Sequence, residues 1–183
     1  MSSNRIELRF AGTGGQGLIL AAKMLAEVLV AAGRKVAQSQ TYEPTSRGGY
    51  CNADLVVAGV EVDYPLATAL DGLVLLDTLA IAPSWSLLKP GARVLADTRL
   101  CPEVPAGEFR VLHLPLTRTA IELGSERVAN IVALGALAAL CGLCERDALA
   151  RTVRAEAPRS FVDLNLDALA AGWGLAQAAD AVA

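Results

Sequence analysis

The feature that most constrains this chain is a run of glycines between an apolar strand pattern and a long apolar helix pattern. Glycines stand at Gly12, Gly14 and Gly17, the G-x-G-x-x-G spacing of a turn that places a phosphate at a helix N-terminus. Such a turn needs glycine because its backbone angles are unusual and because a ligand or a neighbouring segment approaches the main chain closely. The spacing predicts a strand over residues 6–10, then a loop, then a helix over residues 18–32.

The predicted helix over residues 18–32 is unusually apolar. Only Lys23 and Glu27 are charged, and because they lie four residues apart they share one narrow stripe of the helix. Most of the circumference must therefore be buried, either against the sheet alone or against another chain as well.

A nicotinamide dinucleotide would need an acidic residue about 20 residues after the glycines, at the end of the second strand, to bind the ribose. The corresponding segment, residues 36–41, contains no carboxylate before Glu43 and no arginine for a 2′-phosphate. The sequence therefore disfavours NAD. Two interpretations of the loop stay open: it holds a phosphate of another cofactor, or it is a tight turn against a partner chain.

A second motif, Arg47-Gly48-Gly49, follows in a segment rich in turn-forming residues. It sets a permanently charged guanidinium beside two glycines that allow close approach of the backbone. Alone it is typical of an exposed turn, but together with the first loop it predicts a polar site at one end of the sheet. Gln16 is positioned to donate its amide either to a ligand or to neighbouring backbone. The candidate binding residues are Gly12, Gly14, Gly15, Gln16, Gly17, Arg47, Gly48 and Gly49.

Further strand patterns follow along the chain. We expect strands over residues 35–40, 51–57, 73–76, 92–96 and 109–114, with residues 60–64 returning as a short hairpin partner. Two of these strands end at Asp77 and Asp97. These aspartates either line a site at the carboxyl edge of the sheet or, as the interpretation we favour, cap the next segment.

The last third of the chain is helical in pattern, with helices expected over 117–123, 126–143 and 145–157 and from 167 onward. Asn130 is a lone amide in an apolar helix, so it needs a hydrogen-bond partner in the glycine loop or in a second subunit. The whole pattern predicts one domain over residues 1–183. Its expected fold is a three-layer α/β/α sandwich with a mostly parallel or mixed sheet and a Rossmann-like first βα unit.

Composition excludes several functions. The net charge is −3 and the pI about 5.2, with scattered basic residues, so nucleic acid is not an expected partner. The N-terminus enters a strand without an apolar leader, and the apolar stretch over 128–143 is too short to span a bilayer, so we expect a cytoplasmic protein without a membrane anchor.

The four cysteines are accordingly expected to be reduced thiols. Cys141 and Cys144 have the spacing of a redox or metal pair, but the chain has no second such pair and only one histidine, His113. A four-ligand site is therefore incomplete, and core cysteines are the favoured interpretation. No nucleophile–base set is apparent, so we expect neither a catalytic nor a metal-binding residue in this chain.

The Gly12–Gly17 loop, the run 42–49 and Tyr64-Pro65 together closely resemble the gamma subunit of 2-oxoacid:ferredoxin oxidoreductases. This is the family acting on pyruvate, 2-oxoglutarate and 2-ketoisovalerate. The runs 129–135 and 165–168 also match the way that family ends, so the resemblance covers nearly the whole chain.

The resemblance implies a function that the residues alone do not give. Such enzymes oxidatively decarboxylate a 2-oxoacid with coenzyme A to give acyl-CoA, CO2 and reduced ferredoxin. Thiamine diphosphate and magnesium lie between alpha and beta partner subunits, and iron–sulfur clusters lie in beta or in a delta subunit. The gamma chain binds none of these alone and helps to form the coenzyme A entry, where the eight candidate residues would face a coenzyme A phosphate or a partner subunit.

The sequence also departs from the family pattern. Relatives often read Tyr-Gly-Pro-Glu before Arg-Gly-Gly, whereas residues 42–45 read Tyr-Glu-Pro-Thr, which leaves the 2-oxoacid open. The small subunit of indolepyruvate oxidoreductases shares Arg-Gly-Gly, usually in a Gly-Met context that is absent here. A stand-alone nucleotide-binding or oligomeric module, unrelated to thiamine chemistry, is the alternative of a different class.

Overall fold

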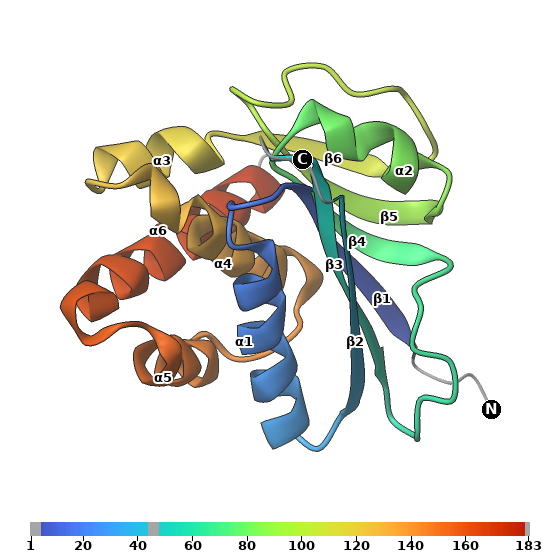
Figure 1. The fold of residues 1–183 in the computed structure, drawn as a ribbon, viewed down its shortest axis with the longest axis horizontal. Helices are drawn as coiled ribbons and strands as arrows, with labels where there is room; N and C mark the ends of the chain where they lie inside the picture. The colour runs from blue at the N-terminus through green and yellow to red at the C-terminus, as the bar shows by residue number, and fades with distance from the viewer. Residues whose placement is uncertain (1–4, 44–47, 182–183) are drawn as a thin grey trace.

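A mixed β-sheet with helices on both faces forms the framework of the computed structural model, which describes residues 5–43 and 48–181 (Figure 1). In the described part, six strands lie in the order β2-β3-β1-β4-β5-β6. Of these strands, β3 alone runs in the direction opposite to the other five. The strands are β1 Ile6–Thr13, β2 Lys35–Tyr42, β3 Tyr50–Ala58, β4 Leu70–Leu75, β5 Leu88–Asp97 and β6 Arg110–Leu114.

The helices are divided unequally between the two faces (Figure 1). On one face α1 and α4 pack against the sheet, and α5 and α6 pack outside them. The opposite face carries the short α2 and the turn before it, and α3 follows β6. The helices are α1 Leu18–Ala31, α2 Ile81–Trp85, α3 Leu116–Glu122, α4 Ala129–Cys141, α5 Arg146–Glu156 and α6 Val162–Ala181, with 3₁₀ turns η1 Thr78–Ala80, η2 Glu126–Val128 and η3 Arg159–Phe161. The expected three-layer fold with a mostly parallel sheet is confirmed.

The central helix α4 is buried almost throughout because α6 crosses it in direct backbone contact. A Cβ atom at Gly172 would overlap the carbonyl oxygen of Val132, and one at Gly135 would overlap that of Leu169. Two glycines at the crossing therefore allow the helices to approach closely. This contact fixes α4, and with it Asn130, relative to the sheet.

The polar face of β1, formed by Glu7 and Arg9, is buried and not exposed to solvent. Arg9 and Asp54 lie opposite each other in the β1–β3 register and form a two-pronged ion pair, with Nε–Oδ1 at 2.7 Å and Nη2–Oδ2 at 2.8 Å. Arg9 Nη1 also donates to the carbonyl oxygen of Pro83 on α2, at 3.0 Å. The sequence of β1 alternates polar and apolar residues, and its polar layer is covered by α2.

The prediction that residues 60–64 form a short hairpin strand is wrong. Because β3 is antiparallel, it ends at the amino end of β1, where Ile6 pairs with Val57, and the chain must then cross β1 to begin β4. Residues 59–69 make this crossing without forming a strand. Glu7 anchors the crossing, since Oε2 accepts the N–H groups of Thr68 and Ala69 at 2.6 and 2.7 Å.

Candidate functional site

The glycine loop lies where two adjacent parallel strands send the chain in opposite directions. From β1 the chain turns through α1 toward β2, whereas from β4 it turns through α2 toward β5. The carboxyl ends of β1 and β4 therefore form a topological switch point, the place where ligands bind in open α/β sheets. The structure puts the predicted loop at this point.

The loop backbone leaves the start of α1 open. Gly15 and Gly17 have φ angles of 94° and 74°, in the left-handed region that favours glycine. Gly17 is the N-cap residue of α1, and in the described part of the chain no side chain caps this helix. The first-turn N–H groups and the positive end of the helix dipole are thus available to an anion.

Gln16 acts as a brace between the loop and the sheet. Its Oε1 accepts the backbone N–H of Thr13 at 2.7 Å, and its Nε2 donates to the carbonyl oxygen of Leu76 at 2.8 Å. A Cβ atom at Gly12 would overlap this amide oxygen. Of the two partners considered for Gln16, the structure shows the neighbouring backbone. Position 12 has to be glycine because any side chain there would collide with the Gln16 amide.

Asn130 braces the loop from the other side. Its Nδ2 donates to the carbonyl oxygen of Gly17 at 2.9 Å, although 113 residues separate the two. A Cβ atom at Gly17 would overlap Asn130 Nδ2. The expected partner of this buried amide is therefore the glycine loop, and its Oδ1 has no hydrogen-bond partner among the described residues.

The second glycine motif joins the first directly. The Gly14 N–H donates to the carbonyl oxygen of Gly49 at 3.0 Å, and Thr13 pairs with Tyr50. Gly48 has a φ of 73°, and a Cβ atom there would lie 3.5 Å from the Gly14 oxygen. Two segments thirty residues apart thus form one surface, while Arg47 lies outside the described residues.

This arrangement also explains the lack of an NAD signature. In the nicotinamide-binding order the second strand lies next to the first, whereas here β3 separates β1 from β2. The end of β2 is therefore one strand removed from the loop.

Two hollows adjoin the loop, with Gly15 lining both. One, of about 200 Å³, lies toward the carboxyl ends of the other strands and is suited to a phosphate-sized group. It is lined by Gly15, Gln16, Leu76, Leu100, Thr117, Glu126, Arg127 and Ala129. The other, of about 480 Å³, is more apolar and follows the first turns of α1 past Leu18, Leu20 and Lys23.

Thr117 is a site residue that the sequence did not suggest. It is buried, its Oγ1 has no partner among the described residues, and it lines the smaller hollow. Its backbone N–H donates to Asp97 Oδ2 at 2.6 Å, while Asp97 Oδ1 accepts from Arg99 and Leu100 N–H, each at 2.9 Å. No local pattern marks Thr117, because its position depends on the end of a distant strand.

The strand-end aspartates act as caps, as favoured from the sequence. Asp77 is the N-cap of η1 and accepts the N–H of Leu79 at 2.9 Å. Asp97 is fully buried and holds the turn after β5. Both position the rim of the site.

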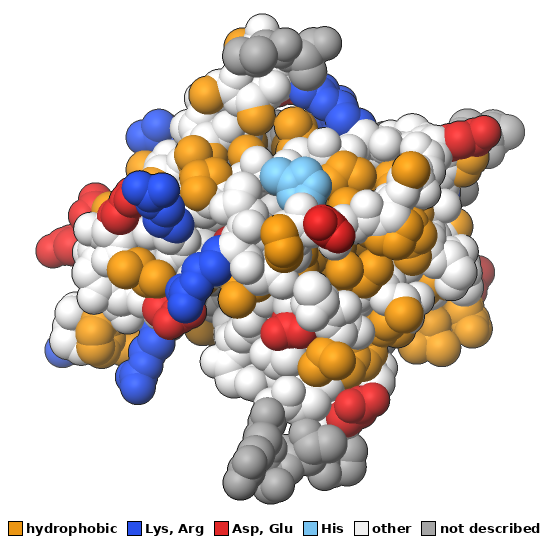
Figure 2. Space-filling view, turned by 90° about the horizontal axis from the view of Figure 1, so that it is seen from above, with side chains coloured by type: hydrophobic (Ala, Val, Ile, Leu, Met, Phe, Trp, Pro, Cys, Tyr) orange, Lys and Arg blue, Asp and Glu red, His pale blue; other side chains and the backbone are white. Residues whose placement is uncertain are grey.

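The surface seen from above in Figure 2 carries mixed charge. Basic side chains lie beside acidic ones over the helical side of the molecule, and hydrophobic side chains are more frequent over the side that carries α2. Exposed ion pairs such as Arg99–Glu126 and Arg118–Glu122 also neutralise basic side chains at the surface. Such a surface lacks the continuous basic stripe typical of nucleic-acid binding.

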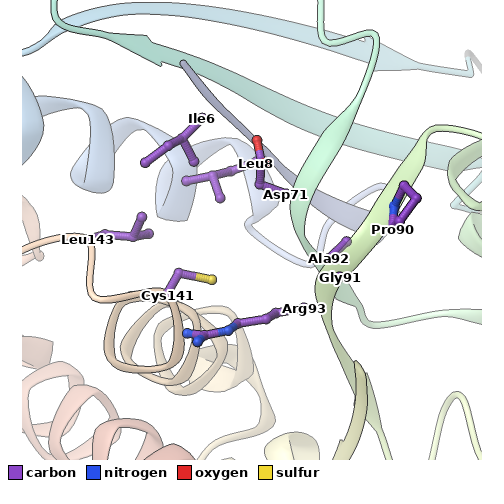
Figure 3. Close-up of a pocket in the computed structure, with 9 residues that line it drawn as sticks. All are labelled: Ile6, Leu8, Asp71, Pro90, Gly91, Ala92, Arg93, Cys141 and Leu143. Carbon is purple, nitrogen blue, oxygen red and sulfur yellow. The ribbon is translucent and has the colours of Figure 1, made fainter. Parts of the chain in front are cut away.

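A further hollow, of about 260 Å³, lies around the amino ends of β1 and β4 and includes Cys141 (Figure 3). The carboxylate of Asp71 there is already bound by Lys89 Nζ, at 2.7 Å, and by the Glu7 N–H, at 2.8 Å. Burial raises the pKa of the Cys141 thiol to about 11, and that of Cys144 likewise to about 11. Both cysteines are partly buried and pack against the core, and the raised pKa of each thiol disfavours the reactive thiolate, in keeping with structural cysteines.

Residues 5–43 and 48–181 contain no group of three or more side chains suited to hold a metal ion. In the same residues no helix has both the length and the apolar content needed to cross a membrane.

Fold and site together define an α/β domain of the gamma-subunit type found in 2-oxoacid oxidoreductases. The chain belongs to the family described as pyruvate ferredoxin/flavodoxin oxidoreductase, whose model matches residues 7–175. The resemblance inferred from the two glycine motifs is thereby confirmed.

Named relatives agree with this assignment. The chain is 37% identical over 139 residues to 2-oxoglutarate synthase subunit KorC of Archaeoglobus fulgidus, covering 75% of this chain and 72% of the relative. A solved keto/oxoacid ferredoxin oxidoreductase gamma subunit from Geobacter sulfurreducens superposes with a TM-score of 0.87 at 38% identity, covering 96% of this chain and 98% of that one.

A larger relative contains the same fold as one part of its chain. The 2-oxoglutarate:ferredoxin oxidoreductase of Magnetococcus marinus, solved with 2-oxoglutarate, coenzyme A and succinyl-CoA bound, matches with a TM-score of 0.84 at 25% identity. The match covers 95% of this chain but 31% of that one. The present chain is a gamma subunit of a 2-oxoacid:ferredoxin oxidoreductase.

Proposed function

We propose that this subunit forms the coenzyme A side of the active site in a complex with alpha and beta partner subunits, and that its glycine loop binds a coenzyme A phosphate. The observation that carries the proposal is the uncapped start of α1 at the switch point. Positive-φ glycines expose backbone N–H groups there, and the partnerless Thr117 Oγ1 lines the adjoining hollow. Phosphate oxygens would satisfy these donors.

The two hollows beside Gly15 suit different parts of such a ligand. The smaller one has room for a phosphate, with the exposed guanidinium of Arg127 at its rim. The larger one offers apolar surface along α1, with Lys23 at its edge, where the ammonium is paired with Glu27 and Glu156. Coenzyme A, an elongated anionic thiol, fits this succession of polar and apolar surfaces, whereas a nicotinamide dinucleotide would lack the acidic residue that binds its ribose.

The described residues offer no group of three or more His, Cys, Asp or Glu side chains to hold an iron–sulfur cluster or the magnesium of thiamine diphosphate. We therefore assign these groups to the partner subunits, together with the oxidation itself and electron transfer to ferredoxin. The KorC relative suggests 2-oxoglutarate as the oxoacid. The purified single chain should show no 2-oxoacid oxidation.

Arg47→Ala in the assembled enzyme tests the proposal. We expect the KM for coenzyme A to rise about 10-fold, the loss of roughly one charged hydrogen bond, while the KM for the 2-oxoacid is unchanged. Arg146→Ala, an exposed arginine on α5, is the matched control and should change neither value. If Arg47→Ala alters neither the coenzyme A dependence nor subunit assembly, the loop is not part of that site.

A further inference from the structure

Strand β2 ends the sheet with an open edge. It pairs with β3 on one side and has no neighbour on the other within the described residues. The Glu43 N–H donates to the Tyr50 carbonyl, so in this register the odd-numbered residues of β2 point their backbone groups toward β3. The even-numbered residues therefore point theirs outward: Val36, Gln38, Gln40 and Tyr42.

This edge carries little protection against pairing. Natural proteins blunt exposed edges with proline, bulges or inward-pointing charges. In contrast, β2 is eight residues long, pairs with β3 without interruption and has only Lys35 as a charged residue, at its first position. An edge of this kind is a template for another strand.

We propose that β2 pairs antiparallel with β2 of a second copy of this chain, about a two-fold axis through Ser39. In this register all four outward-facing residues enter hydrogen-bonded pairs, Val36 with Tyr42 and Gln38 with Gln40. The pairing is reciprocal, as a two-fold interface requires.

The charges at the two ends of the strand support the same register. Lys35 would lie opposite Glu43 of the second copy, at both ends of the paired strands. Lys35 is exposed and has no carboxylate partner among the described residues. Glu43 uses Oε2 to accept the Tyr50 N–H at 3.3 Å, which leaves Oε1 for an ammonium. Opposite charges that face each other across a strand pair are stabilising.

In this register the Tyr42 side chain of each copy lies beside an apolar groove on the other copy. Its side chain is 64% exposed and lies on the α1 face of the sheet, since Tyr42 pairs with the buried Cys51. Val36, its proposed partner, lines an apolar groove of about 430 Å³ between α1 and β2, with Ala26 and Val30 on the helix side. The phenol ring of each copy would fill the groove of the other.

The helices fit the same arrangement. Since α1 packs over both β2 and β3, pairing the strands at a spacing of about 4.8 Å would set the two α1 helices roughly 9–10 Å apart (Figure 1). Packed helices lie at this separation. The contact would cover Val30, which is 55% exposed. The apolar helix α1 would then be buried against a second chain as well as against the sheet, one of the two arrangements expected from its sequence.

A cysteine placed on the axis tests the register. Residues facing each other in a non-hydrogen-bonded pair have Cα atoms about 4.5 Å apart, within the range that a disulfide spans. Full-length Ser39→Cys should therefore form a covalent dimer under mild oxidation. Thr41→Cys is the matched control, because it would face Ala37 and lie roughly 13 Å from its own copy. Equal cross-linking of the two variants, or none in Ser39→Cys, would overturn the proposal.

Charge reversal gives a second test, read out as the dimer dissociation constant by sedimentation. Lys35→Glu and Glu43→Lys should each weaken the dimer about 10-fold, through the two ion pairs lost and the repulsion gained. The double variant should restore wild-type affinity, and Arg146→Glu on α5 should have no effect. A monomeric wild-type chain at about 100 μM, or cross-linking of Ser39→Cys to a different subunit in the assembled enzyme, would contradict the proposed partner.

Discussion

Asn130 on α4 donates a hydrogen bond of 2.9 Å to the backbone carbonyl of Gly17, the N-cap residue of α1. This bond couples the buried core helix to the loop at the switch point. Since α4 is itself fixed by its glycine crossing with α6, the position of the loop depends on packing far from the site. The geometry of the glycine loop therefore depends on the helical layer as well as on the sheet.

Replacing Asn130 by alanine should weaken both stability and the site. The lost hydrogen bond predicts a fall of about 1 kcal/mol in the free energy of unfolding, measured by urea denaturation. The loosened loop should also raise the KM for coenzyme A in the assembled enzyme. Asn165→Ala is the control, because Asn165 Nδ2 donates to the Phe161 carbonyl at 2.7 Å within α6 and its 3₁₀ turn. A stability loss with equal KM values for both variants would show that Asn130 serves the fold alone.

Gln16→Glu should be more damaging than its small size change suggests. A carboxylate cannot donate to the Leu76 carbonyl, and it adds negative charge beside the proposed phosphate position. We expect the KM for coenzyme A to rise more than 10-fold, with Gln16→Ala between this variant and wild type. If Gln16→Ala were the more damaging variant, bracing of the loop would outweigh electrostatics at this position.

The sequence predicted the two glycine segments but not how they meet. Local spacing identified the loop, the second motif and the need of Asn130 for a partner. The insertion of β3 between β1 and β2 was not predictable from residues 35–58, because strand order is set by long-range pairing. The brace from Gln16 to Leu76 and the placement of Thr117 by Asp97 depend on the same strand order. Likewise, only the β1–β3 register shows that Arg9 meets Asp54.

The crossing of α4 and α6 should tolerate no side chain at Gly172. Gly172→Ala forces the two helix backbones apart, and we expect a loss of 2–3 kcal/mol, about that of overpacking a core. Gly174→Ala lies on the same helix with nothing within 4 Å of the added carbon, so it should be neutral or slightly stabilising. Thermal unfolding of the two variants measures the difference. Equal melting temperatures would contradict the close crossing.

The buried thiols predict a loss of stability at alkaline pH. Burial raises the pKa of Cys101 to about 12 and that of Cys141 to about 11, above the value of an unfolded thiol. The unfolded chain therefore loses these protons first, and the free energy of unfolding should fall as the pH rises from about 9 toward 11. Cys101→Ser and Cys141→Ala should each flatten this dependence in urea titrations. An unchanged slope in both variants would mean that other groups control it.

The central claim, that the glycine loop approaches a coenzyme A phosphate, is tested most directly by comparing Gly15→Ala with Gly33→Ala in the assembled enzyme. Both glycines have positive φ, 94° and 82°, and at both an added Cβ atom meets nothing within 4 Å, so the backbone strain is matched. Only Gly15 lines the two hollows beside the loop. We predict that Gly15→Ala raises the KM for coenzyme A about 10-fold and leaves the KM for the 2-oxoacid unchanged, while Gly33→Ala changes neither. Identical coenzyme A kinetics in the two variants would contradict the account.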